Sequence, residues 1–95
     1  MRTVRDARGT ASVIDLPDFE ILDWHDLEGT EGVRRELHLF SCSEGEGVAL
    51  ATIPDEDEDE CDAGTAEWWA RHYTAVFWLE EGETLRTVIE SEEVA

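Results

Sequence analysis

The sequence predicts a small α+β domain: a mainly antiparallel β-sheet of about five to six short strands with one short helix. The apolar residues fall into short stretches that have the length of strands, and Gly, Pro and acidic residues separate these stretches. The connections between the stretches are local, which favours antiparallel pairing. The chain has 95 residues, which is the length of a single domain.

The N-terminal part is expected to contain an arm followed by two strands. Residues 1–9 are polar and hold three of the seven basic residues, so we expect a flexible arm there and one globular domain over residues 10–95. Residues 10–16 carry Val, Ile and Leu and predict a short strand. Residues 19–24 read Phe-Glu-Ile-Leu-Asp-Trp, a partial alternation that predicts a second strand.

The middle of the chain predicts a hairpin. Residues 34–42 alternate so that two leucines face one side of a strand, with His38 and Phe40 on the other side. Residues 43–47 read Ser-Glu-Gly-Glu-Gly, which is typical of a turn, and residues 48–53 form the apolar return strand.

Residues 54–62 are expected to be an acidic, solvated loop, because the run Asp-Glu-Asp-Glu-Asp-Glu-Cys-Asp cannot enter a core. After this loop, a short helix is predicted near residues 63–71, with Thr65 as its N-cap. The β-branched and aromatic residues at 73–79 then predict a strand, and residues 84–89 predict its return strand. The alternative for residues 72–81 is one long helix continuing to the glycine that follows them.

The charge balance is the strongest compositional feature. The chain has 25 Asp and Glu against 7 basic residues, a formal net charge of −18, and all the basic residues are Arg. It contains no Lys, Asn or Gln, which is typical of a GC-rich genome and resembles the proteome style of halophiles. In about 1 M salt the Debye length falls to about 3 Å, so such carboxylates repel each other little. We therefore expect a halophilic source.

The acidity argues against several functions. Its field repels phosphate, so direct nucleic-acid binding and a phosphate-binding loop are not expected. The acids beside Cys61 disfavour a reactive thiolate. No stretch is long and apolar enough to cross a membrane, the N-terminus lacks the apolar region of a signal peptide, and two cysteines form no disulfide framework. We expect a cytoplasmic protein without membrane contact.

No catalytic, cofactor or metal site is predicted from motifs. The candidate metal ligands are Cys42, Cys61, His25, His38 and His72. They lack the close spacing of zinc ligands, so we interpret them as a half-buried Cys42 and surface histidines. The acidic run fails the calcium-loop pattern, because Glu60 and Ala66 stand where that loop needs Gly and Glu. Without a nucleophile motif, the chain is predicted not to be an enzyme.

The functional prediction therefore depends on the tryptophans. Trp68 and Trp69 would point about 100° apart on a helix, so they cannot be equally buried, and we predict a partner or homodimer interface there. The first hypothesis is a small non-enzymatic binding or regulatory module acting through protein–protein contacts. The alternative is an acidic nucleic-acid mimic that inhibits a DNA-binding protein, although a floppy acidic loop would weaken such mimicry.

Overall fold

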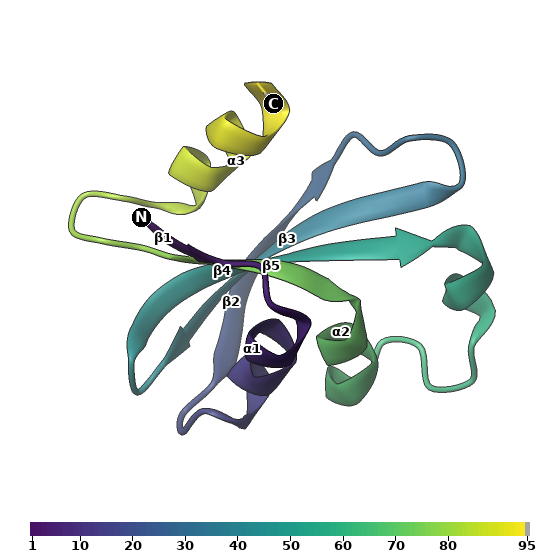
Figure 1. The fold of residues 1–95 in the computed structure, drawn as a ribbon, viewed down its shortest axis with the longest axis horizontal. Coiled ribbons are helices and arrows are strands. Elements are labelled where there is room, and N and C mark those ends of the chain that lie inside the picture. The colour runs from purple at the N-terminus through teal and green to yellow at the C-terminus, as the bar shows by residue number, and fades with distance from the viewer. Residues whose placement is uncertain (95) are drawn as a thin grey trace.

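The computed structural model describes residues 1–94 and contains a five-stranded antiparallel sheet with helices on both faces (Figure 1). In spatial order the strands run β1-β5-β4-β3-β2, so β1 and β2 are the two edges. The elements in chain order are β1 (Arg2–Val4), α1 (Ala7–Ala11), η1 (Ser12–Asp15), β2 (Glu20–Leu27), β3 (Val33–Cys42), β4 (Gly45–Pro54), η2 (Asp55–Asp59), α2 (Ala66–His72), β5 (Tyr73–Trp78) and α3 (Leu85–Val94).

The centre of the sheet confirms the antiparallel prediction. β3 and β4, each ten residues long, form a hairpin that is paired from Val33 opposite Pro54 to Cys42 opposite Gly45. Gly47 lies within β4 opposite Phe40, and a Cβ at this position would come within 2.7 Å of the Phe40 ring. Glycine therefore leaves room for the ring beside the strand.

Apolar side chains are buried on both faces of the sheet. Figure 1 shows α1 and α2 on one face and α3 on the other. The face under α1 and α2 is filled by Val13, Phe40, Ala49, Ala51, Ile53, Trp68, Tyr73 and Val76. The face under α3 is filled by Leu27, Leu37, Val48, Leu50, Ala75, Phe77, Val88 and Ile89. Because β4 is covered on both sides, it is a continuous apolar run rather than an alternating one.

The N-terminal residues are ordered where the sequence predicts a flexible arm at residues 1–9. β1 pairs with β5, with Val4 opposite Val76, and the Val4 side chain packs against the core. The amino group of Met1 lies 3.2 Å from Glu80 and 3.3 Å from Glu83. A three-residue strand is too short to show alternation in the sequence, which is why the prediction missed it.

The strand predicted at residues 10–16 is wrong, because residues 10–15 belong to the helical turns α1 and η1. Asp6 caps α1 by accepting a hydrogen bond from the backbone N–H of Arg8. Thr10 is fully buried, and its hydroxyl donates to the backbone carbonyl of Tyr73 at 2.9 Å. Val13 is buried against the sheet. These long-range contacts override the β-propensity of the segment.

The return strand predicted at residues 84–89 is also wrong, because this segment begins α3. Leu85, Val88 and Ile89 have the i, i+3, i+4 spacing of one helix face, and this face packs on the sheet. The Thr87 hydroxyl oxygen accepts a hydrogen bond from the Thr84 amide at 3.0 Å. Three α-helices are therefore present among the described residues, where the sequence predicts one. The helix at α2 and the strand at β5 are as predicted.

The described chain has the dimensions of one small domain. Its Cα radius of gyration is 12.7 Å, close to the value of about 13 Å expected for 100 residues. Among residues 1–94, no helix combines the length and the apolar character needed to cross a bilayer.

Candidate binding site

The edge strand β2 carries the exposed apolar side chains of this otherwise acidic surface. Ile21, Leu22 and Trp24 are 40%, 47% and 66% exposed, and they are the large hydrophobic residues exposed within the described chain. Ile21 lies opposite Phe40 and Trp24 lies opposite His38, so both share the sheet face that α2 covers further along. The register shifts between Ile21 and Asp23, which places Leu22 in a β-bulge.

A shallow groove of about 270 Å³ runs between this edge and α2. Its walls and floor are Ile21, Trp24, Glu36, His38 and Trp69. The ring of Trp69 meets the ring of His38 edge-on, with their centroids 4.4 Å apart. The consecutive strands β2 and β3, together with the helix α2, which is distant from them in sequence, therefore form one surface with aromatic walls and a polar floor.

The floor of the groove is the end of a buried polar chain. His38 Nδ1 lies 3.0 Å from the Tyr73 hydroxyl, and His38 Nε2 lies 3.2 Å from a Glu36 carboxylate oxygen. Both contacts are satisfied by a neutral ring if Tyr73 donates to Nδ1 and Nε2–H donates to Glu36. Burial, with the nearby Glu36 carboxylate as a second cause, raises the pKa of Tyr73 above its ordinary range, so the phenol keeps its proton.

Glu36 continues this chain toward the surface. Its second carboxylate oxygen forms an ion pair with the Arg34 guanidinium at 2.9 Å, and Arg34 also lies 3.0 Å from Glu58 in the acidic run. Both ring nitrogens of His38 are thus occupied by neighbours. In this arrangement the ring holds the groove floor together and has no free lone pair for general-base chemistry.

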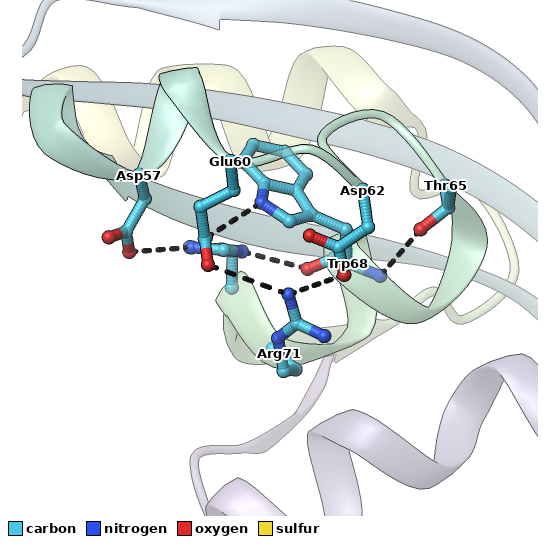
Figure 2. A network of polar contacts seen from close by, with 7 residues as sticks. Asp57, Glu60, Asp62, Thr65, Trp68 and Arg71 are labelled. Atoms are coloured by element: carbon cyan, nitrogen blue, oxygen red, sulfur yellow. Dashed lines mark hydrogen bonds and ion pairs between the residues drawn. The ribbon is translucent and has the colours of Figure 1, made fainter.

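The acidic run over residues 54–62 stays largely exposed to solvent, as predicted, but several of its side chains also contact α2. Figure 2 shows Glu60 beside the indole of Trp68, and Asp62 beside Arg71. Trp68 Nε1–H donates to Glu60 at 3.0 Å, and Arg71 donates to Asp62 at 2.8 Å. This hydrogen bond from Arg71 lowers the pKa of Asp62. The predicted exposure of the run holds, since η2 buries no residue, whereas the 3-10 turn and the contacts with α2 were not predicted.

His72 completes the attachment of the acidic run. Its Nδ1 lies 2.7 Å from the Trp68 carbonyl and its Nε2 lies 2.9 Å from Asp57, so both nitrogens donate when the ring is protonated. Asp57, Glu60 and His72 place three possible metal-ligand atoms within 4.8 Å of one another. Without an ion, His72 satisfies Asp57, and Trp68 satisfies Glu60.

The other predicted metal-ligand candidates lie apart from these clusters. Cys42 is half-buried, as expected, and Cys61 is exposed; both are free thiols. His25 lies 3.7 Å from Glu93 near α3. The prediction of surface histidines is wrong for His38 and His72, which are 4% and 7% exposed. A strand alternation shows which side chains share a face, but it cannot show that a helix covers that face.

The two tryptophans singled out by the sequence have different surroundings. Trp68 is 2% exposed and belongs to the core, whereas Trp69 is half-buried and forms a wall of the groove. Trp24 is the residue that sequence reasoning missed. Its position at the end of a short alternating strand was visible, but its exposure depends on β2 lying at the sheet edge.

Comparison of the chain with known protein families, with curated proteins and with solved structures found no match.

Proposed function

We propose that this protein is a small binding module that takes up an extended segment of a partner protein beside β2. The single observation that carries the proposal is the placement of Ile21, Leu22 and Trp24 on an edge strand. An edge strand has unpaired backbone N–H and C=O groups, which a further strand can pair with. Exposed apolar side chains beside such an edge add affinity and mark it as an interaction surface.

Trp24 accounts for much of the expected affinity. A Trp side chain buries about 150–250 Å² when it is covered. With 66% of Trp24 exposed, the apolar area that a partner could cover is worth about 3 kcal/mol at about 25 cal/mol per Å². β2 has eight residues, and a single edge strand of this length offers less contact area than a standard interface of about 800 Å² per partner. We therefore expect weak and reversible binding.

The charges on β2 favour a different protein over a second copy of this chain. Glu20, Asp23 and Asp26 lie on the same strand as the apolar residues. Pairing two copies of β2 would bring these carboxylates together, and like charges across a strand pair are destabilising. Salt screens this repulsion but does not turn it into attraction. A strand that carries basic residues complements the edge instead.

A nucleic-acid mimic is the second candidate function, since the structure orders the densest acidic run as η2. A mimic needs carboxylates that are free to act as phosphates. In this run Asp57, Glu58 and Asp62 already lie within 3.0 Å of His72, Arg34 and Arg71. These intramolecular partners reduce the charge available to a DNA-binding protein, so we rank this function below strand uptake.

The test of strand uptake uses capped eight-residue peptides that alternate Val with Arg, Thr or Glu. In about 1 M KCl we expect the Val-Arg peptide to shift the NMR signals of β2 and to slow hydrogen exchange of its backbone amides. A variant with Leu22→Ser and Trp24→Ser should lose this response, because both side chains are exposed and their loss leaves the core intact. Glu44→Ser, in the exposed β3–β4 turn, is the matched control.

Two results would overturn the proposal. One is the absence of any peptide-induced change in β2, or changes that lie mainly on other elements. The other is sedimentation showing a dimer that the Leu22→Ser and Trp24→Ser changes dissociate, because the edge would then be used by a second copy of the chain.

A further inference from the structure

The opposite edge of the sheet shows what kind of strand this fold accepts. β1 adds to β5 with Arg2 opposite Trp78, and the Arg2 guanidinium carbon lies 5.5 Å from the centroid of that ring. Arg5, just beyond β1, lies 5.6 Å from the Phe77 ring. Both distances allow cation–π attraction. One edge is therefore closed by a short strand, and one arginine in this strand and one just after it lie over aromatic rings of the neighbouring strand.

The β2 edge carries an aromatic ring, as β5 does, but no arginine-bearing strand is paired with its outer side among the described residues. Trp24 is 66% exposed, and no strand of residues 1–94 lies beyond β2. Beside Trp24 the groove continues to Trp69, with Glu36 in its floor. One oxygen of Glu36 contacts His38 and the other is ion-paired with Arg34, and a carboxylate oxygen can accept more than one hydrogen bond.

We infer that the segment taken up by β2 carries an arginine, and that its guanidinium lies in the groove lined by Trp24, Trp69 and Glu36. This inference rests on the proposed function and names the chemistry of the partner. An arginine suits the groove better than a lysine, because its planar, weakly hydrated head stacks on aromatic rings and also donates to a carboxylate. The net charge of −18 favours a basic partner in the same way.

The experiment compares two capped peptides that repeat the Arg-Thr-Val unit of β1, one with arginine and one with citrulline, which has nearly the same shape without the charge. Binding is followed by NMR of the backbone amides and Trp indole N–H groups in about 1 M KCl. At this salt concentration the Debye length is about 3 Å, so long-range attraction between the acidic protein and the basic peptide is screened. We expect the citrulline peptide to bind about 3- to 30-fold more weakly, the range that cation–π contacts allow.

Two variants locate the effect. Trp24→Ala removes a wall of the groove and should abolish the preference for arginine. Leu22→Ala is the matched control, because Leu22 is exposed on the same strand and does not line the groove; it should weaken both peptides and keep the preference.

The outcomes separate this inference from the proposed function. If neither peptide perturbs β2, strand uptake itself fails. If both peptides perturb β2 with equal affinity, strand uptake stands and the arginine site is overturned. If Trp24→Ala retains the preference for arginine, the guanidinium lies elsewhere and the groove assignment is wrong.

Discussion

The hydrogen bond between Tyr73 and His38 provides a direct test of the buried polar chain. Tyr73→Phe removes one hydroxyl and keeps the ring that packs in the core. The two partners are 3% and 4% exposed and lie 3.0 Å apart, so the change leaves His38 Nδ1 buried without a partner. Such an unpaired group costs about 1–3 kcal/mol. For a domain of this size, the corresponding loss in Tm is about 5–20 °C.

The measurement is thermal and urea unfolding followed by circular dichroism in about 2 M KCl, where charge repulsion is screened. Thr74→Val is the control, because it also removes a hydroxyl from β5, but one that is exposed and 3.2 Å from the Thr52 hydroxyl. We expect this control to change stability by less than about 0.5 kcal/mol. If Tyr73→Phe changes stability as little as the control does, the Tyr73–His38 contact does not stabilise the fold as argued.

Two further predictions concern the acidic charge. If the net charge of −18 is an adaptation to salt, the Tm of the protein should rise as KCl increases from about 0.1 M to above about 1 M, whereas a Tm independent of salt would contradict a halophilic origin. The second concerns Asp62, whose pKa in the folded state is lowered by Arg71 below the ordinary value of 3.8. The Asp62–Arg71 contact therefore stabilises the fold above pH 3.8, and this stabilisation is lost as the pH falls through the lowered pKa. Asp62→Asn should therefore lower the Tm at pH 6 and match the wild type at the acid end, while the control Asp59→Asn, at an exposed position of the same run, should change the Tm at pH 6 little.

The attachment of the acidic run has a consequence for the groove. Arg34 bridges Glu36 at the groove floor and Glu58 in η2. Trp68, which lies in the core, and Trp69, which forms a groove wall, are neighbours on α2, and their rings meet edge-on with centroids 4.9 Å apart. The acidic run, the core and the candidate site thus share one helix. Some of the carboxylates therefore connect the acidic run to α2 and to the groove floor.

The sequence by itself determined the local elements. β2, β3 and β4 each follow an alternating or continuous apolar pattern, and α2 follows an N-cap at Thr65. These features depend on residues that are neighbours in the chain, which is why local patterns predict them. The same reasoning failed at residues 84–89, where Thr, Val and Ile have β-propensity but also the spacing of a helix face, and packing on the sheet decided between the two.

Only the tertiary structure decided which of these residues form a site. The alternation in β3 placed His38 and Phe40 on one face, but α2 and Tyr73, distant in the sequence, buried that face and gave His38 its partners. Strand order made β2 an edge, and this exposed Trp24 while Trp68 entered the core. Pattern within a segment fixes which side chains share a face, whereas contacts between distant segments determine whether that face meets solvent, a helix or a partner.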